Sequence, residues 1–386
     1  MALNFDTRFR PVWAEIYLDR LRHNLKEVRR LVGPRVAIFA VVKADAYGHG
    51  ALQAAQAFVE AGADYLAVAL PEEGIELRQA GFKQPILVFG PYFPNQAPAF
   101  LEYDLMPTLA GPEALADLAS HVKGTGSGSG KTLAVHVKVD TGMSRVGVQH
   151  GSLAADLVKK VADTAGLKIA GMYTHFAKAD ETDKQSALRQ MEIFMKTIAL
   201  VEQAGIKIPI KHMANSAAII DLPQIYLDAV RPGIMLYGLY PSEEVHKDRV
   251  DLRPAMELKA RVSHVKLVEA GTTISYGGTY APKKASTIAT IPAGYADGYS
   301  RILNGRGAEV IIRGRRYPVA GRICMDQFMA DAGEDEVAIG DEAVLFGRQG
   351  GAFVSADEVA SKLGTINYEV TCMVSRRVPR VYREEQ

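Results

Sequence analysis

The sequence predicts an α/β fold: a (β/α)8 barrel followed by a C-terminal domain built mostly of β-strands. Three observations lead to this fold class. Apolar segments alternate with helical segments through the first part of the chain, as is typical of a parallel sheet. Eight such strands can be counted, the number that a barrel requires. Near residue 248 the alternation of apolar and helical segments gives way to short alternating strands with glycine-rich separators. This pattern favours a second, β-rich domain.

The first helix and the first barrel strand are clear in the sequence. The helix is expected to be capped by Asp19 and to stop at Gly33-Pro34, which cannot continue it. Its apolar positions recur at helical spacing: Leu21, Leu25, Val28 and Val32. The segment Val36 to Val42 follows, and all seven of its side chains are apolar. Such a run predicts a strand that is buried on both faces.

The other barrel strands are expected from further apolar segments. They lie at Tyr65 to Leu70, Ile86 to Gly90, Leu105 to Leu109, Leu133 to Asp140, Ile169 to His175, His212 to Asn215 and Leu227 to Tyr237. Helices are expected between most of them, for example at Gly50 to Ala61 and Ser186 to Ala204. The second of these should place Leu188, Met191, Met195 and Ile198 on one face. Periodicity alone does not exclude an open doubly wound sheet, but eight strands favour the barrel.

This change of pattern divides the chain into a barrel domain, residues 1–248, and a β domain, residues 249–386. A charged stretch from Glu243 to Arg253 and then Pro254 precede the new pattern. The strands expected after it are Leu258 to Val268, Thr287 to Ile291, Glu309 to Ile312 and Ala343 to Phe346.

Composition narrows the class of function. The chain has 386 residues and a formal net charge of +1, so a nucleic-acid partner is not indicated and a small metabolite is the easier substrate. Its two cysteines, Cys324 and Cys372, form neither a disulfide framework nor a C-x-x-C metal site. Met1 to Asp19 has no signal-peptide core, and no apolar run is long enough for a membrane helix. We therefore expect a soluble, cytoplasmic protein without a metal.

The segment Gly124 to Gly130 invites a nucleotide-binding interpretation, because it runs into Lys131-Thr132. A P-loop would need glycine where Thr125 stands and a helix after the lysine. A strand is expected there instead. A flexible surface loop is the better interpretation.

Lys43 is the first candidate for chemistry, since it follows the apolar strand directly in Val41-Val-Lys-Ala-Asp-Ala-Tyr-Gly-His-Gly50. A poorly solvated lysine favours its neutral amine, a nucleophile toward carbonyl compounds such as pyridoxal phosphate (PLP). A glycine-rich turn is expected after it. A lysine that merely extends to solvent at a strand end remains the alternative.

Other unusual residues fall at corresponding strand ends, where a barrel carries its active site. They are His175, the pair Asn215-Ser216, and the segment Arg231-Pro-Gly-Ile234. Each has an ordinary explanation: a hydrogen-bonded core histidine, a helix N-cap, a structural ion pair or a packing glycine. Their common position makes a shared site the better hypothesis.

Nine motifs give the chain a resemblance to a known family over essentially its whole length. They are VVKADAYGHG (41–50), HVKVDTGMSRVG (136–147), THFAKAD (174–180), HMANSAA (212–218), RPGIMLYG (231–238), SYGGTY (275–280), GYADGYSR (294–301), GRICMDQ (321–327) and NYEV (367–370). The chain resembles the alanine racemases, PLP-dependent enzymes with a barrel and a C-terminal β domain. VVKADAYGHG together with CMDQ is highly specific.

The resemblance implies racemisation of L- and D-alanine by two bases, for cell-wall D-alanine. Removal and return of the Cα proton on opposite faces of a planar carbon is most simply done by two opposed groups. The resemblance assigns Lys43, which also carries PLP as a Schiff base, to the D face. It assigns Tyr276 of the partner subunit to the L face, which implies a homodimer with shared sites. From the sequence alone, Tyr276 would be a cross-strand aromatic residue.

The resemblance also distributes the binding roles. Arg231 faces the pyridine nitrogen and His175 joins its hydrogen-bond network; a guanidinium is a poor proton source, which should suppress side reactions. The phosphate is implied to bind Tyr47, Ser216, the amides of Gly233 and Ile234, and Tyr368. The substrate carboxylate is implied to bind Arg145 and the backbone of Met325 of the partner subunit.

Lys138 is unusual because strand alternation places it with His136 and Asp140 on one face of a barrel strand, opposite three valines. A free ammonium there beside Arg145 would be costly. The family's solution is carbamylation by carbon dioxide, which turns the cation into an anion that can hold Arg145. An ion pair with Asp140 is the alternative.

Two other functions remain open at this point. A racemase for serine or lysine would have the same motifs, although Tyr368, placed near the substrate side chain by the resemblance, favours a small substrate. A non-catalytic PLP-binding protein on the same barrel would lack the C-terminal SYGGTY and CMDQ motifs, and this chain has both.

Overall fold

A computed structural model describes residues 10–124 and 132–384, so most of the predicted Gly124 to Gly130 loop lies outside the described residues. The chain divides into two compact units. One, here called the barrel unit, holds Arg20–Ala46 and Ala51–Arg253. The other, the β unit, holds the segment that ends at Asp19, Tyr47–Gly50, and the segment that begins at Pro254.

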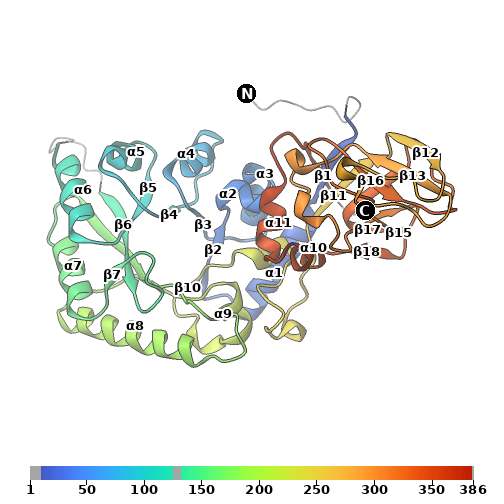
Figure 1. Ribbon diagram of the computed structural model, residues 1–386. Coiled ribbons are helices and arrows are strands. Elements are labelled where there is room, and N and C mark those ends of the chain that lie inside the picture. The colour runs from blue at the N-terminus through green and yellow to red at the C-terminus, as the bar shows by residue number, and fades with distance from the viewer. Residues whose placement is uncertain (1–9, 125–131, 385–386) are drawn as a thin grey trace. The chain divides into compact units, whose positions relative to one another are not determined.

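Eight parallel strands close the barrel unit into a ring (Figure 1). In order around the ring they are β2 (Ala37–Val41), β3 (Tyr65–Val68), β4 (Ile86–Pro91), β5 (Leu105–Leu109), β6 (Leu133–Asp140), β8 (Leu167–Tyr173), β9 (Ile210–His212) and β10 (Ala229–Val230). The β5–β6 and β10–β2 pairings close it. The predicted barrel is therefore confirmed, and the open sheet is excluded.

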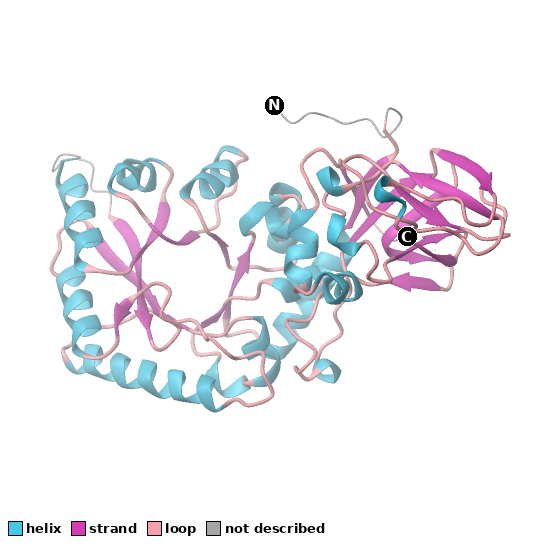
Figure 2. Ribbon diagram, in the orientation of Figure 1, coloured by secondary structure: helices cyan, strands magenta, loops and turns pink. Residues whose placement is uncertain are grey.

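Helices lie on the outside of the ring of strands (Figure 2). They are α1 (Leu18–Val32), α3 (Ala51–Glu60), α4 (Pro71–Gln79), α5 (Ala97–Glu102), α6 (Pro112–Gly124), α7 (Ser152–Ala162), α8 (Gln185–Gln203) and α9 (Ser216–Asp221). The barrel unit also contains the 3-10 helices η1 (Pro94–Gln96), η2 (Pro223–Ile225), η3 (Ile234–Tyr237) and η4 (Lys247–Arg249) and the short strand β7 (Val148–Gln149). The predicted apolar face of α1 is buried.

Two local predictions in the barrel unit were wrong. The eighth strand was expected to reach Tyr237, but β10 is only two residues long, because Pro232 has no N–H for a ladder and the chain then turns into η3. The buried face of α8 is formed by Ala187, Gln190, Phe194, Thr197, Ile198 and Val201. Met195, expected on that face, is 42% exposed. The prediction was wrong because it counted only apolar residues, whereas the buried face also contains the polar residues Gln190 and Thr197.

The β unit contains two sheets. The larger has the order β15-β14-β17-β11-β1-β19, with β18 paired to β17, and the smaller has the order β12-β13-β16. The strands are β1 (Val12–Tyr17), β11 (Met256–Arg261), β12 (His264–Val268), β13 (Ser286–Ile291), β14 (Glu309–Ile312), β15 (Arg315–Pro318), β16 (Phe328–Asp331), β17 (Glu342–Gln349), β18 (Ala352–Val354) and β19 (Arg380–Arg383). Helices α10 (Ala356–Leu363) and α11 (Asn367–Met373) and 3-10 helices η5 (Tyr276–Gly278), η6 (Tyr295–Asp297) and η7 (Arg301–Leu303) complete it.

The unit boundaries differ from the predicted division at residue 248. The barrel unit continues to Arg253, and the N-terminal strand belongs to the β unit. β1 pairs antiparallel with β11 and parallel with β19, so its ladder bonds are made with strands that follow it by more than two hundred residues. Such long-range pairing is not visible in a local pattern. The expected strand Leu258 to Val268 is likewise two strands, β11 and β12.

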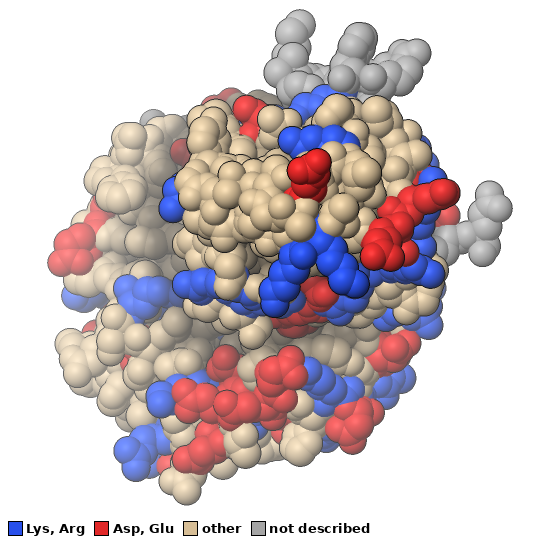
Figure 3. Space-filling model, turned by 45° about the vertical axis from the view of Figure 1, so that its right-hand side comes forward, with Lys and Arg blue, Asp and Glu red and all other residues tan. Residues whose placement is uncertain are grey.

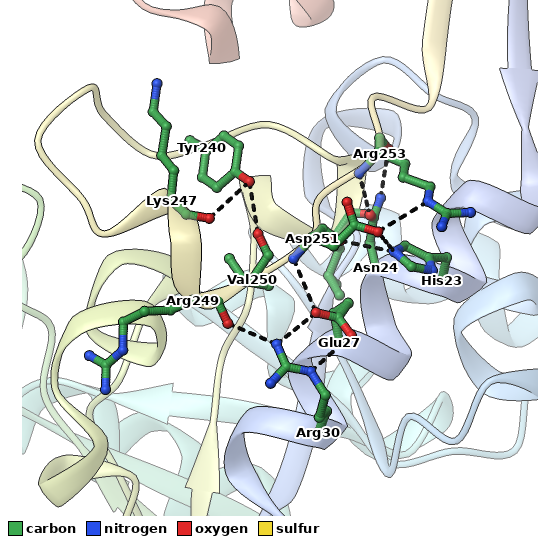
Figure 4. A network of polar contacts seen from close by, with 11 residues as sticks. His23, Asn24, Glu27, Arg30, Tyr240, Lys247, Arg249, Val250, Asp251 and Arg253 are labelled. Carbon is green, nitrogen blue, oxygen red and sulfur yellow. Dashed lines mark hydrogen bonds and ion pairs between the residues drawn. The ribbon is translucent and has the colours of Figure 1, made fainter.

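A polar network fastens the last segment of the barrel unit to α1 (Figure 4). Asn24 is fully buried; its amide nitrogen donates to the carbonyl oxygens of Leu236 and Arg253 at 3.1 and 2.9 Å, and its oxygen accepts from the Arg253 N–H at 2.8 Å. Beside it, Glu27 accepts from the Asp251 N–H at 3.1 Å. These bonds satisfy the backbone of a segment that has little secondary structure of its own.

Asn24→Ala should therefore lower the free energy of unfolding by about 3 kcal/mol, because it leaves buried backbone groups without partners. Chemical denaturation measures this difference. Lys26→Ala, at an exposed position of the same helix, is the control and should change stability by less than about 0.5 kcal/mol. Equal stability of the two variants would contradict the role assigned to the network.

No helix within the described ranges is long and apolar enough to cross a membrane. On the face shown in Figure 3, basic and acidic residues both occur, so neither sign covers it alone. This agrees with the nearly neutral net charge.

Candidate active site

Lys43 lies two residues beyond the end of β2, a strand whose residues Ile38, Phe39 and Ala40 are fully buried. The Val42 N–H still donates to the Ala67 carbonyl of β3 at 2.9 Å, so the chain is held against its neighbour up to the residue before the lysine. The Lys43 side chain is half-buried. The sequence-predicted placement at the end of the first barrel strand is what the structure has.

The turn after Lys43 differs from the expected glycine-rich turn. Four consecutive non-glycine residues, from Ala44 to Tyr47, have φ angles of 52° to 54° and form one left-handed helical turn. Only afterwards do Gly48 and Gly50 adopt positive φ. A left-handed conformation costs roughly 1–2 kcal/mol per residue that carries a Cβ atom. The backbone next to Lys43 is therefore strained and must be held by other contacts.

Lys138 points into the barrel from β6, as strand alternation predicts. It is 6% exposed, and its ammonium lies 5.3 Å from the centre of the Tyr173 ring. Burial, together with the charge of Arg231, lowers the pKa of Lys138 to about 7. Within the described part of the chain no ion pair joins it to Asp140, whose Oδ1 accepts from the N–H groups of Gly142, Met143 and Ser144. The Asp140 ion pair considered from the sequence is not formed.

Arg231 is the centre of the site's hydrogen bonding. It follows β10, is 3% exposed, and its Nη2 donates to the carbonyl oxygens of Thr174 and Met213 at 2.6 and 3.1 Å. Its Nη1 lies 2.9 Å from His212 Nδ1 and its Nη2 lies 3.3 Å from His175 Nδ1. Among residues 10–124 and 132–384 it has no carboxylate partner, so the alternative of a structural ion pair does not apply. Burial lowers its pKa to about 10, which leaves it charged at neutral pH.

The histidines around Arg231 are neutral and their tautomers follow from geometry. Burial and the Arg231 charge lower the pKa of His212 and of His175 well below the ordinary value. A guanidinium only donates, so His212 Nδ1 accepts. The His212 proton is then on Nε2, which lies 3.0 Å from His136 Nδ1. His136 in turn carries its proton on Nε2. The arginine is thus fixed by a chain of two neutral histidines.

A buried glutamine on α8 holds two loops of the site together. Gln190 is 3% exposed; its nitrogen donates to the Thr141 hydroxyl at 3.1 Å and to the His175 carbonyl at 3.0 Å, while its oxygen accepts from the Ala177 N–H at 2.9 Å. Thr141 and Thr174 hydroxyls are also bonded, at 2.8 Å. These contacts join the loop that leads to Arg145 with the loop that carries His175.

The predicted phosphate-binding residues of the barrel unit form a compact donor set. Asn215, and not Ser216, caps α9, since its oxygen accepts from the Ala218 N–H. The Ser216 oxygen accepts from the N–H groups of Gly233 at 2.9 Å and Met235 at 3.4 Å, so its hydroxyl proton is directed elsewhere. The Gly233 amide therefore donates its hydrogen bond to Ser216. Ile234 begins η3, where an N–H has no partner inside the helix. A hydroxyl and an amide are thus positioned to bind an anion.

Of the remaining predicted residues, Arg145 is exposed in the barrel unit and the others belong to the β unit. The rings of Tyr47 and Tyr368 lie near each other, with centroids 6.1 Å apart. Tyr276 is 70% exposed and Met325 52% exposed. The Ser275 hydroxyl donates to the Arg322 carbonyl at 2.6 Å, which holds the segment of Tyr276 against the segment that leads to Met325.

Sequence reasoning assigned no role to Glu73, His136, Gln190 or His212. Two of them had a signal: His136 and His212 are polar residues within expected barrel strands, and both are fully buried. Glu73 and Gln190 had none, because their contacts are with loops far away in the sequence.

Comparison with known proteins identifies the family. Residues 16–241 match the model of the alanine racemase N-terminal domain and residues 255–382 that of the alanine racemase C-terminal domain. The chain is 50% identical over 373 residues to the alanine racemase of Desulforamulus reducens, covering 96% of this chain and 99% of that protein. It is 48% identical to the alanine racemase of Methanococcus maripaludis, with coverage of 96% and 98%.

Solved structures agree with these matches. Alanine racemase from Clostridium difficile 630 superimposes with a TM-score of 0.91 at 43% identity, covering 97% of this chain and 96% of that one. Alanine racemase from Bacillus anthracis with bound L-Ala-P has a TM-score of 0.91 at 38% identity, with coverage of 99% and 96%. The chain belongs to the alanine racemase family.

Proposed function

We propose that the chain interconverts L-alanine and D-alanine with PLP as cofactor, supplying D-alanine for peptidoglycan. The observation that carries the proposal is Arg231: a buried guanidinium, charged at neutral pH and without a carboxylate partner in the described residues, beside neutral His175. When bound, PLP withdraws electrons from the substrate's Cα–H bond and makes that proton removable. The cysteines Cys324 and Cys372 are thiols and are not joined in a disulfide, which supports a cytoplasmic location.

The residues of the barrel unit fit this cofactor. Lys43 would hold it covalently, and the Ser216 hydroxyl and Ile234 amide would bind its phosphate, with Gly233 orienting Ser216. Tyr47 and Tyr368, whose rings lie close together, are proposed as further phosphate ligands. Arg231 would face the ring nitrogen and donate a hydrogen bond to it without giving up its proton, so the ring would stay unprotonated.

Two groups move the proton in this proposal. Lys43 would remove the proton on the D face as the neutral amine and return it there as the ammonium, and Tyr276 of the partner subunit would do the same on the L face as phenolate and phenol. The exposure of Tyr276 in the single chain supports a role toward a second subunit. Arg145 and the backbone of Met325 of the partner subunit would hold the substrate carboxylate, so that Cα lies between the two bases.

Racemisation of a panel of amino acids tests the function. With PLP supplied, circular dichroism should show that L-alanine and D-alanine each decay to the racemate, and that serine and lysine react much more slowly. Activity with lysine or serine above that with alanine would reassign the substrate. Tight PLP binding without any racemisation would make the protein a non-catalytic PLP binder.

Hybrid dimers test the shared site. Lys43→Ala and Tyr276→Phe subunits are each expected to be inactive, but a hybrid has one site with both native bases. Co-refolding the two, followed by separation through different affinity tags, should recover activity in the hybrid fraction. Inactive hybrids, shown by mass to contain both subunits, would contradict the partner role of Tyr276.

We propose that Lys138 is carbamylated and holds Arg145. Its amine nitrogen would bond to the carbon of CO2 and lose a proton, so that an anion replaces a buried cation. The reaction needs the neutral amine, which a pKa of about 7 supplies at neutral pH and above. Lowering the pH below 7 protonates the amine and should release CO2.

Carbon-13 NMR with labelled bicarbonate measures the carbamate. At pH 8 a carbamate signal is expected in the native protein and not in Lys138→Met, and it should fade as the pH drops through about 7. Lys168→Met, at an exposed position of β8, is the control and should keep the signal. A native protein without the signal, under conditions where an added small-molecule carbamate is seen, would contradict the modification.

A further inference from the structure

The left-handed turn after Lys43 is strained, and two carboxylates hold it. Glu73, in the first turn of α4, accepts the Ala44 N–H through Oε1 at 2.6 Å. Asp45 Oδ1 accepts the Ala51 N–H at the start of α3 at 2.8 Å, and the Ala46 N–H donates to the Val42 carbonyl at 3.0 Å. The first of these bonds is made to the amide that directly follows Lys43.

The two oxygens of Glu73 do different things. Oε2 accepts the N–H groups of Ala69 and Leu70 at 2.7 and 3.1 Å, which is the ordinary capping contact at the start of a helix. Oε1 is not needed for that cap and binds Ala44 instead. One carboxylate therefore joins the ends of the neighbouring strands β2 and β3, and fixes the backbone from which the Lys43 side chain leaves.

We propose that Glu73 is a positioning residue for Lys43: its bond to the Ala44 amide fixes the left-handed turn and so directs the lysine amine at one face of the substrate. This inference rests on the proposed function, in which Lys43 is the base for D-alanine. Hydrogen bonds from amides to a carboxylate are charge-assisted and strong, as a strained turn requires. An ordinary cap would not need the second oxygen.

Glu73→Gln separates the two roles. Glutamine supports the same helix cap, with its one oxygen on the Leu70 side. Its NH2 group would then face the Ala44 N–H, donor against donor, and that bond is lost. Glu72→Gln is the matched control: it makes the same charge change in the same helical turn, at an exposed side chain. Glu73→Asp, which keeps the charge but shortens the reach, is a second test variant.

The first measurement needs neither cofactor nor substrate. Hydrogen exchange of the Ala44 amide, in the dimer without PLP, should be about tenfold faster in Glu73→Gln and Glu73→Asp than in the native protein. Glu72→Gln should exchange at the native rate. Unchanged exchange in both Glu73 variants would overturn the proposal.

The second measurement distinguishes positioning from general weakening. Because Lys43 takes the proton of D-alanine, poorer alignment makes that step more rate-limiting. The primary isotope effect with α-deuterated D-alanine should rise in the PLP-loaded Glu73 variants, and that with α-deuterated L-alanine should fall, with kcat lowered about tenfold. Equal changes for both enantiomers, or a result equal to Glu72→Gln, would overturn the proposal. Failure of the proposed function would instead be seen in the native enzyme, as an absence of alanine racemisation.

Discussion

Replacing Lys43 with alanine should abolish racemisation in both directions. The lysine has two proposed roles, as the covalent anchor of PLP and as the base for D-alanine. Loss of a general base alone lowers kcat by about 10²–10⁴-fold, so the measured loss should be at the upper end of that range or beyond. Because the side chain is only half-buried, the folded state should survive the change.

Three observations check this expectation together. Borohydride reduction followed by mass spectrometry should label the native chain on Lys43 with one cofactor and leave Lys43→Ala unlabelled. Thermal unfolding should show that the variant is folded, and Lys178→Ala, which removes an exposed lysine, should keep native activity. A Lys43→Ala protein that racemises alanine at the native rate would contradict the assigned chemistry.

Replacing Arg231 with lysine should reduce both activity and stability, although it keeps the charge. The guanidinium bonds at once to His212 and to the Thr174 and Met213 carbonyls, and a single ammonium cannot reach all of them. Buried acceptors left without donors should lower the free energy of unfolding by about 3 kcal/mol. Because the partner of the cofactor's ring nitrogen is displaced, we expect kcat to fall about 10²-fold.

Denaturation in urea and steady-state kinetics measure the two effects separately. A control is Arg249→Lys, since this arginine is in an exposed segment of η4, and it should change neither quantity appreciably. An Arg231→Lys variant of native stability would show that the hydrogen-bond network around the guanidinium is dispensable.

The barrel could be predicted because strands buried on both faces are mostly apolar, and six of the eight expected segments overlap strands of four to eight residues. The seventh, His212 to Asn215, shares only His212 with the three-residue β9. The eighth could not be predicted, since Leu227 to Tyr237 is apolar for a different reason: η3 is buried although it is not a strand. The place of β1 in the β unit depends on pairing with β11, which no local pattern contains.

Candidate site residues could be proposed from the sequence where a charged residue lies in a mostly apolar segment. Lys43, Lys138 and Arg231 are charged residues in apolar segments, and the structure buries all or part of each. What escaped prediction depends on contacts between distant loops: Gln190 with Thr141 and His175, or Glu73 with Ala44. The left-handed turn was missed because Ala44, Asp45 and Ala46 carry Cβ atoms, and strain of that kind has no compositional signal.

The fate of the Cα proton in heavy water tests the central claim, that two different groups serve the two faces of the substrate. L-alanine is converted in D2O, and the small amount of D-alanine formed early is analysed by mass spectrometry. If the proton leaves to one base and returns from another, the first D-alanine should contain solvent deuterium in nearly every molecule, and the same should hold for L-alanine formed from D-alanine. A substantial share of product that retains the substrate's own proton would indicate a single base and would contradict the account.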